Sequence, residues 1–180
     1  LTSDYRRMLE EPQKVIDGLK CILALFDNAK GILAVEDNKP DCISLMQELV
    51  RNESRIEVMP LKTKYPQGAE RCLIYAVTGR EINSSMLPAD AGCIISNVGT
   101  VCAISDAFRL GMPLIERALT ISGGAVAKPC NLKVPVGTLV SDLMGEDAQF
   151  TLKEGETAKI ISGGPMMGFA MPSADFPVAK

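Results

Sequence analysis

The spacing of hydrophobic residues predicts alternating helices and strands. Apolar side chains in residues 12–26 are one, three and four apart, as an amphipathic helix requires, and helices that begin at Pro40 and at Gly68 show the same spacing. Between them, 31–35 and 55–61 are short apolar or alternating runs of strand length. This alternation favours an α/β layer with a mainly parallel sheet.

The pattern changes after the third helix. Residues 81–92 are polar and aperiodic, and Cys93–Ile95 then predicts a buried strand. Ser96 and Asn97 form an N-cap pair for a fourth helix that ends near Gly111. Backbone N–H groups and the positive helix end converge at such a turn, which favours a phosphate contact, although ordinary helix capping explains the same residues.

A second, smaller domain is predicted after Gly111. We expect strands in 112–122 and 125–137, a short helix in 138–144 and a final strand in 155–161. This order is typical of a β-grasp-like module.

Two glycine-containing features lie in this domain. The tetrapeptide Ile-Ser-Gly-Gly occurs at 121–124 and at 161–164, either as a repeat or as two strand ends with glycine turns. Residues 163–171 place three methionines and a phenylalanine among glycines, which suits an adaptable contact surface or a plug in a core.

Composition and charge exclude several classes of function. The 180 residues are 47% hydrophobic, which predicts a packed core, and 19 Lys plus Arg against 22 Asp plus Glu give a net charge of −3. That charge provides no overall attraction to nucleic acid or anionic lipid. The absence of histidine excludes histidine-dependent catalytic pairs and metal sites. The longest apolar run, 21–26, is too short to cross a bilayer.

The cysteines are scattered singly, without any CxxC pair. This usage is typical of reduced thiols packed as small hydrophobes, and it predicts a reducing compartment. An enzyme with a cysteine nucleophile has little support, because no histidine or basic neighbour would stabilise a thiolate. The six residues are Cys21, Cys42, Cys72, Cys93, Cys102 and Cys130.

Two further segments are candidates for binding. Glu36-Asp37-Asn38 follows a predicted strand, where open α/β sheets bind ligands, yet the same residues suit a helix cap. Residues 62–70 carry two lysines and a tyrosine into a helix N-terminus. They would form either the rim of a site for an anionic or aromatic ligand or a solvated loop.

Several motifs together resemble the RnfC family, which comprises one subunit of the Rnf electron-transport complex and its soluble relatives. The resemblance covers essentially the whole chain, and it extends more distantly to the NADH-oxidising flavoprotein subunit of respiratory complex I. The motifs are DYRRMLEEP (4–12), EDNKP (36–40), PLKTKYPQGAE (60–70), SNVGT (96–100) and GGPMMG (163–168).

The resemblance implies a Rossmann-like FMN/NADH-binding α/β domain in 1–111. It implies a β-grasp domain of the soluble-ligand-binding (SLBB) type in 112–171 and a linker toward an iron–sulfur domain in 172–180. The implied function is electron exchange between NADH and iron–sulfur clusters through FMN, in a subunit of an ion-coupled oxidoreductase. Such a subunit lies peripherally on the cytoplasmic face of a membrane beside other subunits, without inserting into the bilayer or binding nucleic acid.

The resemblance also implies cofactor contacts, but no catalytic or metal-ligating residue in this chain. The complex I subunit has two adjacent glutamates, and Ala69 replaces the first of them here. The segment that holds the FMN phosphate matches Ile95, Ser96, Asn97 and Thr100. The segment that lines the flavin and nicotinamide pocket matches Tyr65, Gly68 and Glu70, with Glu36 and Lys64 as further candidates for the dinucleotide.

We expect the chain to be an internal piece of a longer subunit. The family's glycine-rich flavin loop and Asn/Glu-rich segment would lie upstream of Leu1, and CxxCxxC-type [4Fe–4S] ligands downstream of Lys180. This piece would then supply one wall of an FMN site and no cluster.

The alternative is a docking module of a soluble reductase complex with no flavin of its own. Its β-grasp domain and methionine-rich loop would recognise a partner. The alanine at 69 favours this alternative, and the intact turn at 96–100 opposes it.

Overall fold

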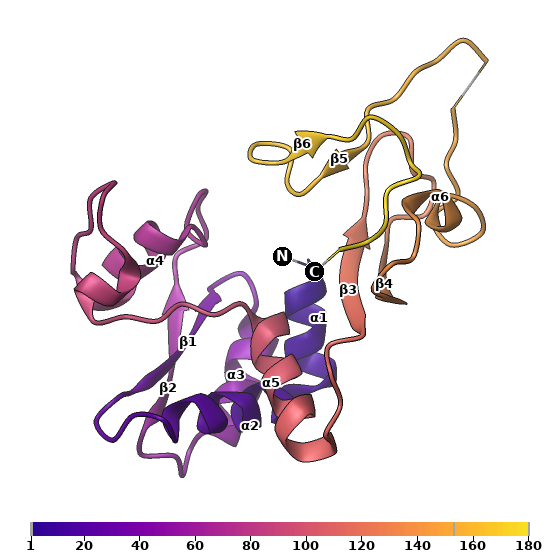
Figure 1. Cartoon of the computed structure of the whole chain (residues 1–180). Helices are drawn as coiled ribbons and strands as arrows, with labels where there is room; N and C mark the ends of the chain where they lie inside the picture. The colour runs from indigo at the N-terminus through magenta and orange to yellow at the C-terminus, as the bar shows by residue number, and fades with distance from the viewer. Residues whose placement is uncertain (1, 153, 180) are drawn as a thin grey trace. The chain divides into compact units, whose positions relative to one another are not determined.

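A computed structural model describes residues 2–152 and 154–179. They form two compact units, Ser3–Pro113 and a second that begins at Leu114 (Figure 1). The elements of the first unit are α1 (Thr2–Glu10), α2 (Pro12–Leu23), β1 (Gly31–Glu36), α3 (Pro40–Leu49), β2 (Ile56–Leu61), α4 (Glu70–Thr78), the 3₁₀ turn η1 (Pro88–Ala91) and α5 (Val98–Leu110). Those of the second are β3 (Glu116–Ile121), β4 (Cys130–Pro135), α6 (Val140–Leu143), β5 (Ile161–Ser162) and β6 (Phe169–Ala170).

Two parallel strands form the sheet of the first unit. β1 and β2 pair in register from Gly31 opposite Ile56 to Glu36 opposite Leu61. A parallel pair requires a crossover connection, and α3 provides it and packs against β2. The strands predicted at 31–35 and 55–61 are confirmed to within one residue at an end.

The predicted helices of the first unit are confirmed with small shifts at their ends. α2 ends before the predicted Phe26, and α4 begins at Glu70 instead of Gly68. α5 ends at Leu110, because Gly111 adopts a left-handed φ of 63° and closes the helix.

The core of the first unit lies between its helices and the β1–β2 pair. α2 and α5 approach closely at Gly18, where an added Cβ would lie 2.0 Å from the carbonyl oxygen of Val101. Glycine is therefore the residue that allows this backbone contact, and the contact fixes the position of α5. The buried residues are Met8, Val15, Ile16, Leu23, Val35, Cys42, Met46, Val50, Ile56, Val58 and Cys102.

The predicted strand at Cys93–Ile95 is wrong. Ile94 is 65% exposed, and the backbone N–H of Cys93 donates to the carbonyl oxygen of Pro88 at 3.0 Å. This bond closes the η1 turn. An apolar run this short becomes a strand only beside a partner strand, and among the described residues β1 and β2 pair with each other alone.

The second unit contains two antiparallel pairs. β3 pairs with β4 from Glu116 opposite Pro135 to Ile121 opposite Cys130, and α6 follows. These elements confirm, in shorter form, the strands predicted in 112–122 and 125–137 and the helix in 138–144. A small core beneath them contains Val134, Leu143 and Ala148.

The predicted final strand is mostly wrong. Of residues 155–161 only Ile161 lies in a strand, β5, which pairs with the unpredicted β6. Gly155 has a left-handed φ of 84° and the residues after it are exposed, so the pattern there is that of a solvated loop. The Ile-Ser-Gly-Gly tetrapeptides each end a strand, and the left-handed φ of Gly123 and Gly163 confirms the interpretation as glycine turns.

Residues 174–178 lie alongside 137–141 in the second unit. The backbone N–H of Val140 donates to Phe176 at 3.0 Å, and that of Val178 donates to Thr138 at 2.7 Å. The described part of the segment predicted as a linker is therefore hydrogen-bonded to this unit.

Candidate functional site

The N-terminus of α5 is capped by Asn97. Its side-chain Oδ1 accepts a hydrogen bond from the backbone N–H of Gly99 at 2.8 Å, and its Nδ2 donates to Oδ2 of Asp4 at 3.0 Å. The capping predicted from the sequence is confirmed, and Asp4 is an unpredicted partner. Both polar groups of the Asn97 amide are thus engaged within the protein.

The two side-chain hydroxyls beside this cap are exposed and can bind a ligand. Ser96 and Thr100 are exposed, and neither side chain has a hydrogen-bond partner within 2–152 and 154–179. Ile95 is half-buried beside them. The Asn97 side chain already accepts from the N–H of Gly99, so the donors that this end of α5 offers to an anion are the two hydroxyls and the other first-turn N–H groups.

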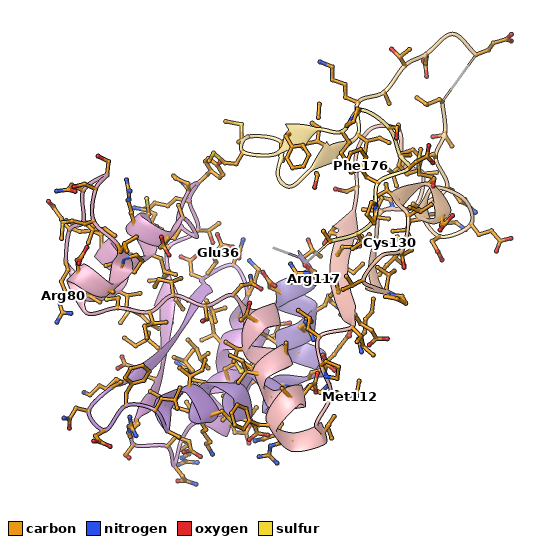
Figure 2. The ribbon with its side chains drawn as sticks, viewed as in Figure 1. Glu36, Arg80, Met112, Arg117, Cys130 and Phe176 are labelled. Carbon is orange, nitrogen blue, oxygen red and sulfur yellow. The ribbon has the colours of Figure 1, made fainter. Side chains whose placement is uncertain are left out.

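The carboxyl end of β1 carries the second candidate segment. Figure 2 shows Glu36 where β1 ends. Lys39 Nζ lies 2.8 Å from Oε2 of Glu36 and also donates to Asn38 at 2.7 Å. The candidate dinucleotide contact Glu36 is therefore ion-paired through Oε2, and its Oε1 has no partner among the described residues.

Asp37 connects the ends of the two parallel strands. Its Oδ1 accepts hydrogen bonds from the hydroxyl of Thr63 at 2.7 Å and from the backbone N–H of Thr63 at 3.0 Å. Its own backbone N–H donates to Leu61 at 2.8 Å. The hydrogen bonds from the Thr63 hydroxyl and N–H lower the pKa of the Asp37 carboxyl.

The loop beyond Thr63 presents the third candidate segment. It consists of two tight turns, in which Gln67 N–H donates to Lys64 and Ala69 N–H donates to Pro66, each at 2.9 Å. Gln67 is buried and anchors the loop. The candidate residues around it are exposed and have no hydrogen bond or ion pair from their side chains to described residues: Lys64, Tyr65 and Glu70.

Helix α1 links these segments on one edge of the first unit. Tyr5 donates its hydroxyl hydrogen to Asp41 in the first turn of α3, which lowers the pKa of Asp41 and raises that of Tyr5. Lys39 Nζ lies 6.0 Å from the centre of the Tyr5 ring. Because Asp4, one residue earlier, contacts Asn97, the N-termini of α3 and α5 are both held by α1.

The sequence gives no indication of the roles of Asp4 and Tyr5. They belong to the motif in 4–12, but nothing in its local pattern indicates partners on two other helices. The structure brings the candidate segments to one edge through Asp4, Tyr5 and Asp37. Among the described residues, no hydrogen bond or ion pair joins a candidate cofactor residue to a candidate from another segment.

The side chains on this edge fit parts of a flavin nucleotide. Hydroxyl and helix N-terminal donors at Ser96 and Thr100 suit a phosphate, and the exposed ring of Tyr65 suits an aromatic ring system. The carboxylate of Asp4 lies close to the same helix end and opposes a phosphate there.

The cysteines give no sign of a nucleophile. Burial raises the pKa of the Cys42 and Cys102 thiols, which favours the unreactive neutral form. Cys72 is exposed on α4. Within the described ranges, no three Cys, Asp or Glu side chains gather in a way that would hold a metal ion.

The methionine-rich segment forms an exposed tip in the second unit. Met166 is 72% exposed, Met167 86% and Phe169 65%. The interpretation as a core plug is therefore wrong for this tip, and an apolar contact surface remains.

In the part of the chain that the structure describes, no helix combines the length and apolar character needed to span a bilayer.

Comparison with known families accounts for both units. The model of the Nuo51 FMN-binding domain family matches residues 1–106. The chain belongs to this family. The SLBB domain model matches 119–170. The chain therefore contains an FMN-binding-domain sequence followed by an SLBB domain. The first of these forms the mixed α/β unit with the small parallel sheet.

Whole-chain relatives are ion-translocating oxidoreductase subunits. The chain is 48% identical over 180 residues to a subunit of the proton-translocating ferredoxin:NAD(+) oxidoreductase complex of Clostridium ljungdahlii, covering all of this chain and 38% of the relative. It is 42% identical to the Na(+)-translocating counterpart of Acetobacterium woodii, of which it covers 40%. It is 37% identical to the corresponding subunit of the ion-translocating oxidoreductase complex of Pseudomonas aeruginosa, of which it covers 23%.

These matches confirm the resemblance to the RnfC family. The chain spans about two fifths of the length of the first two relatives and about a quarter of the third.

Proposed function

We propose that the chain forms one wall of an FMN site in a longer subunit that transfers electrons between NADH and iron–sulfur clusters. The observation that carries this proposal is the N-terminus of α5, where Ser96 and Thr100 offer unpartnered hydroxyls in a region that matches an FMN-binding family, within the residues that the structure describes. When bound, the flavin supplies the exchange between two-electron and one-electron steps.

Each candidate residue has a distinct part in this proposal. Ser96, Thr100 and the backbone beside Ile95 bind the phosphate, and Asn97 acts as the cap that orients the first turn of α5. Tyr65 covers the ring system, while the backbone at Gly68 leaves space beside it, since an added Cβ there meets nothing within 4 Å.

Charged side chains would contact the dinucleotide. Glu70 and Lys64 are exposed in the same segment as Tyr65, so they can reach a ligand without breaking an ion pair to any described residue. Glu36 would bind a ribose hydroxyl through Oε1, because Lys39 is paired with Oε2 of the same carboxylate.

The wider assembly is also part of the proposal. The first unit would be a Rossmann-like layer completed by segments outside this chain, and the second a β-grasp domain. The relatives are named as subunits of ion-translocating complexes, so we infer that this protein assembles with other subunits on the cytoplasmic face of a membrane. Iron–sulfur clusters would lie outside the described residues.

The test is an anaerobic titration of the longer subunit and of this chain, first with FMN and then with NADH. Flavin fluorescence reports binding, and absorbance reports reduction. The proposal predicts that the longer subunit binds FMN and that NADH bleaches it, whereas this chain alone binds FMN weakly or not at all. A longer subunit that binds no FMN contradicts the proposal.

A second candidate is a docking module without flavin. The exposed tip at Met166 and Met167 favours it, because flexible apolar side chains suit protein contacts. Failure of the longer subunit to bind FMN, together with loss of complex assembly on Met167→Glu substitution, would support this candidate instead.

A further inference from the structure

We propose that Asp37 is a positioning residue that holds the Tyr65 loop in the orientation needed for flavin binding. This inference rests on the proposed function. Asp37 follows β1, and the loop follows β2, so the carboxyl ends of both parallel strands meet at this residue.

The hydrogen bonds of Asp37 fix the start of the loop. One carboxylate oxygen accepts both the backbone N–H and the hydroxyl of Thr63, at 3.0 and 2.7 Å. The backbone N–H of Asp37 continues the strand pairing to Leu61. Residues 61 and 63 are therefore both tied to the residue after β1, and Lys62 between them has little freedom.

The far end of the loop is fixed separately. Two turns with 2.9 Å hydrogen bonds end at Ala69, and the buried Gln67 anchors them before α4 begins. Tyr65 lies between the two anchored ends with 67% of its surface exposed. Its own hydroxyl has no partner among the described residues, so its position depends on the loop backbone and hence on the contact between Asp37 and Thr63.

Substitutions distinguish the effect of the hydrogen bonds between Asp37 and Thr63 from the effect of the Asp37 charge. Asp37→Ala removes both bonds to Thr63, whereas Asp37→Asn retains an oxygen that accepts both. Thr63→Val removes only the hydroxyl bond. Asp27→Ala is the matched control, because Asp27 is an exposed aspartate near the amino end of β1 with no partner among the described residues.

The first measurement uses this chain and needs no flavin. Amide hydrogen exchange of Thr63, followed by NMR, is expected to accelerate by up to about tenfold in Asp37→Ala, since the N–H loses its acceptor. Asp27→Ala is expected to exchange like the wild type, and Asp37→Asn to exchange at a rate between those of the wild type and Asp37→Ala, because a neutral amide oxygen accepts more weakly than a carboxylate. Unchanged exchange in Asp37→Ala would overturn the inference.

The second measurement is FMN affinity of the longer subunit by fluorescence titration. We expect Asp37→Ala to weaken binding about fivefold to tenfold, and Thr63→Val and Asp37→Asn to weaken it less, since each keeps part of the hydrogen bonding. If the wild-type subunit binds FMN and the Asp37→Ala variant binds it with the same dissociation constant, the positioning role is refuted, but the proposed flavin site is not. A wild-type subunit that binds no FMN would refute the proposed function itself.

Discussion

Replacing Gly18 by alanine tests how α5 is positioned. An alanine Cβ would lie 2.0 Å from the carbonyl oxygen of Val101 and 2.8 Å from its carbonyl carbon. Real Cβ contacts stay above 3.0 Å, so α2 and α5 must separate by about 1 Å at this point. The obstacle is backbone, which cannot rotate away as a flexible side chain would.

The expected cost follows from two opposing effects. Overpacking in a rigid interior costs about 1–3 kcal/mol, and the clash with a helix backbone places this case at the upper end. Alanine is favoured over glycine in a helix by up to about 1 kcal/mol, which offsets part of that cost. We expect a net destabilisation of about 2 kcal/mol.

Urea unfolding followed by circular dichroism at 222 nm measures this effect, because most helical residues lie in the first unit. With a urea dependence of about 1–2 kcal/mol per molar, the midpoint should fall by about 1–2 M. Gly68→Ala is the control, since its Cβ meets nothing within 4 Å, and it should change stability by less than about 0.5 kcal/mol. Equal midpoints for Gly18→Ala and the wild type would refute the close contact between α2 and α5.

Two further predictions concern titrating groups. Tyr5→Phe removes the hydrogen bond that lowers the pKa of Asp41, so that pKa should rise toward 3.8 in an NMR titration, and an unchanged value would contradict the contact. The stabilisation from this lowered pKa is complete above 3.8 and is lost as the pH falls through the folded-state pKa, so the stability difference between the two proteins should shrink in acid. A thiol reagent at neutral pH should label the exposed Cys72 while Cys42 and Cys102 resist until the protein unfolds, and rapid labelling of either buried thiol in the folded protein would contradict their burial.

The sequence pattern correctly predicted the elements that depend on interactions between residues close together in the chain. The periodicity of residues 12–26 and the glycine after α5 gave the helices, because amphipathic spacing and left-handed caps are encoded within a few residues. The prediction of a strand at Cys93–Ile95 was wrong because a strand requires a partner strand, which its own sequence does not specify. β6 was missed for the same reason, since two residues leave no alternating pattern.

The contacts that assemble the candidate site were beyond a pattern-based prediction. Asp4 and Asn97 are 93 residues apart, and Asp37 and Thr63 are 26 apart. Each partner looks locally like an ordinary helix-end or loop residue. The cap at Asn97 was predictable because its acceptor bond is local, whereas the use of its amide nitrogen by Asp4 was not.

The most direct test of a flavin phosphate at the α5 N-terminus is the effect of charge there on FMN affinity in the longer subunit. Asp4→Asn removes a carboxylate near the proposed phosphate position while keeping an oxygen that accepts from Asn97, so binding should tighten by about threefold. Asn97→Asp keeps the cap acceptor but adds a charge, so binding should weaken by about fivefold or more. The double variant should return toward the wild type. Affinities that do not change, or that change in the same direction in both single variants, would contradict a flavin phosphate at this helix end.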